Sequence, residues 1–257
     1  MNPPCLTSRL VLGLVLSAVL AFSLAPPPAT ASIVYNGSAD YSITSNPNGV
    51  WSYGTSTTAT SPFAPFTLYG VADTTAYNNA NLDRWSVVPG SGPDDTAYPF
   101  LMVNTGAVSV TVLDVTLTPG EMVLHPGALG EVSILRWTAP GTGVIGIDAT
   151  FTGVSTSTTT TDVHVLRNLT ALFDGLINIG GNDGTEHYGT TSLAVNAGDT
   201  ISFVVGRGNG NFTFDTTSLA ATIDYTANTA AVPEPGTAIL VGFGAMAAFV
   251  AARGRRA

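Results

Sequence analysis

The feature that most limits what this chain can fold into is a set of short segments in which apolar and polar residues alternate. Residues 145–151 show the pattern most clearly, because every odd-numbered residue there is apolar and small or polar residues stand between them. A period of two places one side of an extended segment in a core and the other side in water. Similar runs, which we predict to be β-strands, occupy residues 41–44, 50–53, 66–69, 84–88, 107–113, 132–137, 162–166, 201–205 and 221–225.

Turn-forming pairs separate these predicted strands, and no amphipathic helix of useful length is evident between them. The pairs include Asn48-Gly49, Pro119-Gly120 and Asp174-Gly175, whose residues favour tight turns. With 45% apolar residues the chain can bury a core, and no fixed-period repeat indicates a solenoid. We therefore predict that residues 32–225 form one all-β domain, a single β-sandwich or jelly roll. The Ser/Thr run 155–161 is predicted to be a loop or an exposed strand edge.

The N-terminus has the three parts of a secretory signal peptide. Arg9 supplies the positive charge, residues 10–25 are apolar, and the Ala-Thr-Ala of residues 29–31 has the form of a cleavage site. A retained membrane anchor is the alternative, which the three prolines before the site disfavour. The predicted cut lies between Ala31 and Ser32 and removes residues 1–31.

The C-terminus ends with a second segment that does not fit a soluble domain. Residues 237–252 carry no charge, and as a helix they would rise about 24 Å, a little less than the ~30 Å hydrocarbon core of a bilayer. The flanking residues are Val232, Pro233, Glu234 and Pro235 before the run and Arg253, Arg255 and Arg256 after it. We predict a transmembrane helix over 237–252 whose arginines stay on the cytoplasmic side, preceded by a spacer at 226–231. An ordinary membrane anchor and a buried core helix are the alternatives.

The order of Val-Pro-Glu-Pro, short apolar helix and terminal arginines in residues 232–257 resembles the PEP-CTERM protein-sorting signal. The resemblance implies that an exosortase is the processing partner, that cleavage occurs near the motif, and that the protein is delivered to the cell surface or matrix. Residues 124–140, 162–168 and 197–223 also look like segments that recur in the ectodomains of such proteins. The last of these segments is similar to the closing strands of carbohydrate-binding jelly rolls, which concerns fold more than activity.

The distribution of charge excludes one class of partner. All seventeen acidic residues except Glu234 lie within residues 32–232, which hold only four of the eight arginines and no lysine, so this region has a net charge of −12. Such a surface repels phosphate backbones, and nucleic-acid binding is not expected. The single cysteine, Cys5, lies in the predicted signal peptide, so the mature protein is expected to have neither disulfides nor thiol chemistry.

No arrangement of residues in the predicted domain indicates catalysis or a cofactor. We interpret His125, His164 and His187 as isolated surface or turn residues, because none has a metal-ligand spacing. There is no G-x-S-x-G motif, the Gly206–Gly210 segment fits a hairpin turn better than a phosphate loop, and the acidic pair Asp94-Asp95 fits a solvated loop. The glutamates of the domain, from which a hydrolase would need a facing pair of acids, are Glu121, Glu131 and Glu186.

Two further candidate sites are a calcium site and an aromatic platform for sugars. Asp183 and Glu186 could offer oxygens to calcium, but the segment lacks the regular spacing of a calcium loop, and we predict no bound metal. Trp51 and Trp85, flanked by polar loops, are candidate platforms for stacking on sugar rings. Trp137 shares a face with Leu135 and is assigned to the core.

These patterns together predict an exported protein, membrane-anchored until processing and then at the cell surface or in the extracellular matrix. We expect it to be non-enzymatic, with a structural or adhesive task in an exopolysaccharide matrix and weak glycan contact. The alternative is a secreted glycan-active enzyme whose active site the sequence does not reveal. Two carboxylates facing each other across a cleft would favour the enzyme, and an exposed aromatic strip would favour glycan binding.

Overall fold

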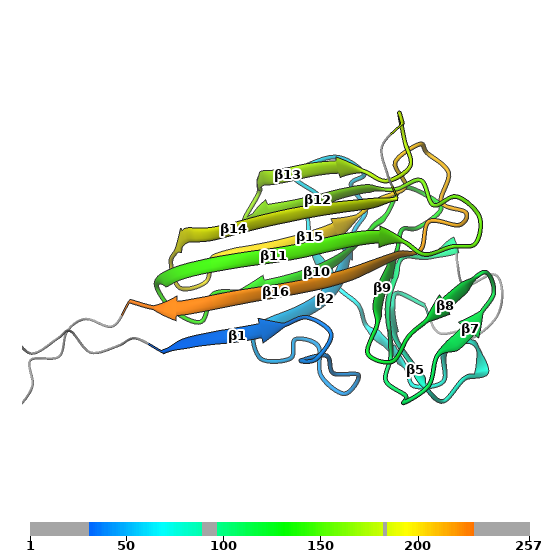
Figure 1. Ribbon diagram of the computed structural model, residues 1–257, viewed down its shortest axis with the longest axis horizontal. Coiled ribbons are helices and arrows are strands. Elements are labelled where there is room, and N and C mark those ends of the chain that lie inside the picture. The colour runs from blue at the N-terminus through cyan, green and yellow to red at the C-terminus, as the bar shows by residue number, and fades with distance from the viewer. Residues whose placement is uncertain (1–30, 89–96, 182–183, 229–257) are drawn as a thin grey trace, which may run out of the picture. The chain divides into compact units, whose positions relative to one another are not determined.

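The computed structural model describes residues 31–88, 97–181 and 184–228, whose regular structure is almost entirely β-strand (Figure 1). Within these ranges helix is limited to one 3-10 turn, η1 (Ala76–Asn78). Nothing helical there has the length and apolar character needed to span a bilayer. The predicted signal peptide, transmembrane helix and sorting motif lie outside the described residues.

The described strands form two large antiparallel sheets and one small hairpin sheet, as a sandwich-like fold. The larger sheet runs in the spatial order β14 (Thr185–Val195), β11 (Gly143–Gly153), β16 (Thr217–Ala227), β9 (Met122–His125), β6 (Phe100–Asn104), β5 (Leu82–Ser86) and β4 (Val71–Asp73), and β1 (Ser32–Asn36) also pairs with β16. The smaller sheet runs in the order β13 (Thr170–Leu176), β12 (Asp162–Arg167), β15 (Thr200–Val205), β10 (Val132–Thr138), β2 (Trp51–Ser56) and β3 (Thr67–Leu68). The hairpin consists of β7 (Val110–Val112) and β8 (Val115–Leu117).

The main core lies between the two large sheets and is built by the alternation seen in the sequence. In β11 the residues Ile145, Ile147, Ala149 and Phe151 are buried in it, whereas the residues between them lie on the outer face. Trp137 of β10 is fully buried and directly opposite Trp51 of β2, which confirms its assignment to the core. One side of each strand therefore supplies the core, as the period of two predicts.

A second, smaller core lies on the outer face of the larger sheet. It is formed where the β7–β8 hairpin and η1 cover β6 and β9, and it contains Phe100, Met102, Val115, Leu117 and Val123. β6 is consequently buried on both faces, because Leu101 and Val103 of the same strand belong to the main core. Among the described residues, nothing covers the outer face of β11 and β16 in this way (Figure 1).

The last strand, β16, connects the two parts of the larger sheet. Along one edge it pairs with β11 over its whole length. Along the other edge it pairs with β9 near Thr217 and with β1 from Thr222 to Thr226. Since Thr226 and Ala227 belong to β16, the predicted spacer at 226–231 begins too early: these residues continue the ladder with β1 and β11 instead of leaving the fold.

Candidate functional site

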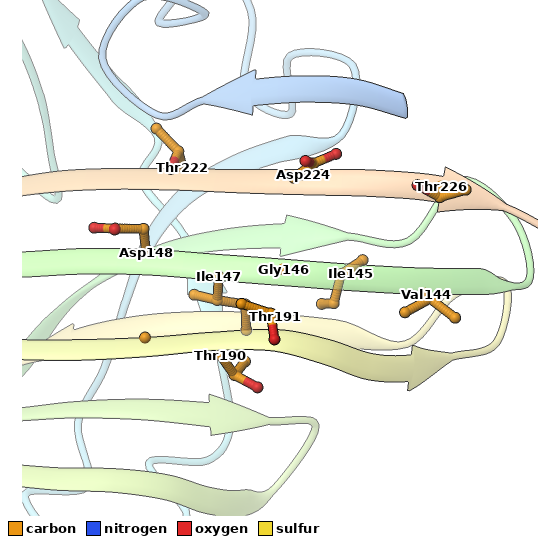
Figure 2. Close-up of a pocket in the computed structure, with 11 residues that line it drawn as sticks. Val144, Ile145, Gly146, Ile147, Asp148, Thr190, Thr191, Thr222, Asp224 and Thr226 are labelled. Atoms are coloured by element: carbon orange, nitrogen blue, oxygen red, sulfur yellow. The ribbon is translucent and has the colours of Figure 1, made fainter. Parts of the chain in front are cut away.

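An open trough of about 560 Å³ crosses the outer face of the larger sheet over β11, β14 and β16. Figure 2 shows the side chains that line it from these neighbouring strands. Hydroxyl and carboxylate groups predominate among them: Asp148 on β11, Thr190 and Thr191 on β14, and Thr222, Asp224 and Thr226 on β16. With Val144, Ile145 and Ile147 also in the lining, the trough is a mixed surface, and its polar groups can exchange hydrogen bonds with a hydroxyl-rich ligand.

A strand irregularity and a glycine give the trough its form. On β14, Leu193 pairs with Ile145 and Thr190 pairs with Ile147, so that two residues of β14 lie opposite the single residue Gly146. Such a bulge bends a strand and increases its local twist. Gly146 keeps the floor of the trough low because it has no side chain. A Cβ at this position would project from the floor and lie 3.3 Å from the carbonyl oxygen of Thr190.

The two carboxylates of the trough lie side by side on one face. Asp148 pairs with Thr222, and Asp224 pairs with Gly146, which makes the two aspartates diagonal neighbours across adjacent strands. Nε2 of the exposed His187 is 3.4 Å from Oδ1 of Asp148. Glycoside hydrolysis needs an acid on each side of the scissile bond, whereas this arrangement presents both acids from one surface.

The strongest cluster of titratable groups lies on the smaller sheet, around His164. Its Nδ1 is 2.6 Å from Oδ1 of Asp174 and its Nε2 is 2.9 Å from Oδ2 of Asp162, and its ring packs on Phe63 at 4.6 Å between centroids. Burial alone would lower the pKa of His164, but hydrogen bonds to the two carboxylates outweigh it and the pKa is raised. Both ring nitrogens are used in these bonds, so the cluster joins β12 to β13 and offers no free metal ligand.

A buried carboxyl group stands behind this cluster. Asp215 is fully buried, and its Oδ1 accepts hydrogen bonds from the backbone N and the hydroxyl of Thr160 at 2.8 and 3.2 Å. Burial raises the pKa of Asp215 to about 7 in spite of these bonds. The contact fixes the end of the 155–161 segment, which is a loop in the structure, as the sequence predicts.

A second hollow, of about 270 Å³, lies within the small core under the β7–β8 hairpin. Its lining differs from that of the trough, since it includes Phe100, Met102, Val115 and Phe214. His125, at the end of β9, also lines it and is buried. None of the predictions made from the sequence concerned this cavity.

The structure does not bear out the aromatic platform predicted at Trp51 and Trp85. Their exposed fractions are 1% and 7%, and both belong to the main core. The indole N–H of Trp85 donates to the carbonyl of Ser42 at 2.8 Å, and that of Trp51 donates to Asp40 at 3.2 Å. The polar segment around residues 40–42 therefore lies over the two rings, and the hypothesis of a sugar-stacking platform at these residues is wrong.

The three histidines also differ from their interpretation as isolated surface or turn residues. His125 is buried and stacked on Phe100 at 5.0 Å between ring centroids, and His164 is held by two aspartates. Only His187 is exposed in the expected way. The missed feature is the apolar stretch before His125, which places it in a strand that is buried on both faces.

The remaining predicted residues are not brought together into a site. Asp183 and Asp94-Asp95 lie outside the described residues, and Glu186 lies against Gly175 of the opposite sheet. Glu121 and Glu131 each accept backbone N–H groups within a tight turn. In the part of the chain that the structure describes, no three His, Cys, Asp or Glu side chains are grouped to hold a metal ion.

Ser32, after the predicted cut, is the exposed first residue of β1.

Comparison with known proteins identifies the C-terminal segment. Residues 231–256 match the family described as the PEP-CTERM protein-sorting motif. The fold and this segment together define an all-β protein that is exported. More particularly, the chain carries a PEP-CTERM motif, which marks it for exosortase-dependent sorting to the cell surface or extracellular space. No curated protein matches the chain.

Solved structures share only slight similarity with the chain. CBM51 from Clostridium perfringens GH95 in complex with methyl-galactose has 12% identity and a TM-score of 0.33, with 46% of this chain and 80% of that chain covered. A Stig cyclase, Fisc, from Fischerella sp. TAU has 12% identity and a TM-score of 0.33, with 62% and 89% covered. The catalytic domain of a GH87 alpha-1,3-glucanase in complex with nigerose has 10% identity and a TM-score of 0.29, with 82% and 31% covered. None of these similarities is close enough to assign a function to this chain.

Proposed function

We propose that the protein is a non-enzymatic structural or adhesive component of an exopolysaccharide matrix, which holds a neutral polysaccharide weakly in the trough. The observation that supports this proposal is the trough itself, with its threonine hydroxyls and the two carboxylates Asp148 and Asp224. Hydroxyls donate and accept hydrogen bonds and carboxylates accept them, which suits a chain of sugar hydroxyls. Because the surrounding surface is acidic, a polyanionic chain is repelled and a neutral one is not.

The C-terminal sorting segment accounts, in this proposal, for how the domain reaches the matrix. Before processing, residues 237–252 anchor the protein in the membrane, with Arg253, Arg255 and Arg256 on the inner side. An exosortase then cuts near Pro233-Glu234-Pro235 and releases the domain to the matrix. Replacing these three residues by alanines is expected to leave the protein uncut in the membrane fraction, as seen by its size on immunoblots. Unchanged release to the surface would contradict this part of the proposal.

Glycan binding is tested by electrophoresis of the mature protein through native gels that contain a neutral polysaccharide (dextran or galactan) or an anionic one (alginate). We expect retardation in a neutral gel only. The double variant Thr190→Val, Thr222→Val, which removes two hydroxyls from the trough, should weaken binding by about tenfold. The matched control is Thr111→Val, Thr116→Val, because these exposed threonines lie on the β7–β8 hairpin. Equal retardation of both variants would exclude the trough as the site, and release of sugars would point to a glycan-active enzyme.

A further inference from the structure

The cavity under the β7–β8 hairpin has backbone features that the trough lacks. Three large residues that line it have positive φ angles: Leu113 at 51°, Tyr77 at 56° and Phe214 at 68°. Residues with a Cβ rarely adopt this left-handed region, and each such residue costs about 1–2 kcal/mol. Backbone strain of this kind is retained mainly where a function depends on the side chain that it positions.

A matched turn elsewhere in the molecule shows that a positive φ occurs with this loop length, whereas a leucine at the position does not. The β7–β8 and β12–β13 hairpins both have two-residue loops, and in both the first loop residue has a positive φ. In β12–β13 that residue is Asn168 (φ 55°), a type that tolerates the left-handed region. In β7–β8 it is Leu113, which is 59% exposed and so gains little from burial. The large side chain is thus kept where Gly or Asn would fit the turn better.

The mouth of the cavity is apolar. Leu113 and Phe214 are 59% and 42% exposed, and both line the cavity. Behind them, Phe100, Met102 and Val115 are buried. These apolar walls leave few groups for a hydroxyl-rich ligand to bond with, and a sugar would lose the hydration of several hydroxyls on entering without replacing it. The cavity therefore favours a different class of ligand from that proposed for the trough.

Two polar groups in the lining are hydrogen-bond acceptors. Nδ1 of His125 donates to the carbonyl of Pro126 at 2.7 Å, and burial lowers the pKa of His125 to about 4. The ring is consequently neutral near pH 7, and its Nε2 is an acceptor. Oδ2 of Asp114 is buried and has no hydrogen-bond partner among the residues that the structure describes. A buried acceptor without a partner is costly, and a ligand with a donor group would satisfy it once the Asp114 side chain turns towards the cavity.

We propose that this cavity binds a small molecule with a one- or two-ring apolar body and a hydroxyl or N–H donor, which enters between Leu113 and Phe214. The volume of the cavity, about 270 Å³, limits the apolar part of the ligand to one or two rings, since a cavity of about 150 Å³ already accepts benzene. The donor bonds to Asp114 or His125, and the ring packs on Phe100 and Met102. This binding site is separate from the trough and does not depend on glycan binding.

The probes for the test are p-cresol and toluene, which differ by one hydroxyl group, added to the mature exported protein and followed by NMR titration. We expect saturable 1:1 binding of p-cresol, about tenfold tighter than that of toluene. In Asp114→Leu, which removes an acceptor, this preference should fall by several-fold. Absence of saturable p-cresol binding would overturn the proposal, and equal binding of the two probes would overturn the role of the donor.

Two matched substitutions locate the binding. Val112→Trp places an indole in the cavity and should abolish p-cresol binding, whereas Val144→Trp makes the same change in the trough and should leave it intact. Thermal unfolding establishes that each variant is folded. If Val112→Trp does not fold, Leu113→Gly removes a side chain from the mouth, and we expect it to weaken binding several-fold. Equal p-cresol affinity in Leu113→Gly, or loss of binding in a folded Val144→Trp, would contradict the assigned location.

Discussion

The outer face of the larger sheet is open to solvent over some strands and covered by other parts of the chain over others. Over β11 and β16 the outward residues are mainly threonine, aspartate and glycine, and the face is left to solvent. Over β6 and β9 they include Phe100, Met102 and Val123, and the chain covers them with the β7–β8 hairpin and η1. The choice of outward side chain thus decides whether a sheet face becomes an open trough or the wall of a second core. One sheet thereby carries two hollows of opposite chemistry.

The largest effect should come from truncating one outward residue in each half. Phe100→Ala removes a buried ring from the second core and should lower the free energy of unfolding by about 3–5 kcal/mol. Thr222→Ala, the counterpart in the trough, should change it by less than about 0.5 kcal/mol. Urea denaturation of the two variants measures both values. Similar losses in both would show that the open half is also a packed core.

The second effect is a change of stability with pH, and it arises from His125 in the covered half of the sheet. The pKa of His125 is about 4 in the folded protein and 6.5 in an ordinary setting, so the unfolded chain binds a proton between these values that the folded protein does not. The contribution of this group to stability is complete above pH 6.5 and is lost as the pH falls towards 4, by about 3 kcal/mol.

The variant His125→Phe isolates this contribution. It should be less stable at pH 7, because it lacks the hydrogen bond to Pro126, but it should lack the additional loss between pH 6.5 and 4. Comparing the two proteins cancels the opposite contribution of Asp215, whose raised pKa favours the folded state at low pH. Parallel pH curves for the two proteins would show that His125 is not held neutral.

A third, smaller effect should distinguish the β7–β8 turn, which has Leu113 at a positive φ, from the β12–β13 turn, which has Asn168 there. Leu113→Gly should raise the free energy of unfolding by about 0.5–1 kcal/mol, because the relief of a positive φ exceeds the entropy that glycine adds to the unfolded chain. Leu169→Gly, at an equally exposed leucine in the β12–β13 turn, should lower it by about 0.5–1 kcal/mol. Thermal unfolding gives the sign of each change, and the same sign for both would remove the distinction between the turns.

The smallest effect is expected at the floor of the trough. Gly146→Ala adds a methyl group on the open face, 3.3 Å from the carbonyl oxygen of Thr190, and should change stability by less than about 1 kcal/mol while it fills part of the trough. Gly54→Ala would instead place a Cβ directly against the carbonyl oxygen of Thr67, where there is no room for it. Urea denaturation should therefore show a far larger loss for Gly54→Ala, and equal losses would mean that the trough floor is as tightly packed as the core.

The sequence predicts strands in which apolar and polar residues alternate and misses strands that are unbroken apolar runs. Residues 145–151 and 221–225 lie within β11 and β16, and their alternation reports the solvent on one side. In contrast, β6 and β9 are unbroken apolar runs because both of their faces are covered. A search for a period of two cannot detect such strands. β14, an edge strand with three threonines, was missed because polar residues fill most of its first two thirds.

The sites were less predictable than the strands, because they depend on which segments become neighbours. Asp148 and Asp224 are far apart in sequence and meet only because β11 pairs with β16. Trp51 and Trp85 are candidate platforms only because of their polar neighbours in sequence, and in the structure the polar segment around residues 40–42 folds over both rings. One local signal was available for the cavity: a two-residue loop of Leu and Asp between alternating segments, without the glycine or asparagine that such turns favour.

The pairing of β1 with β16 also determines how a tethered molecule would be displayed. Ser32 lies opposite Thr226, so the chain enters the fold and leaves it towards the sorting segment at the same end (Figure 1). The other end of β16, beside β9, is about 33 Å away for a strand of this length. The trough, lined by Thr222, Asp224 and Thr226, therefore lies towards the end of β16 at which the chain enters and leaves the fold. The cavity, lined by Thr216, lies towards the opposite end.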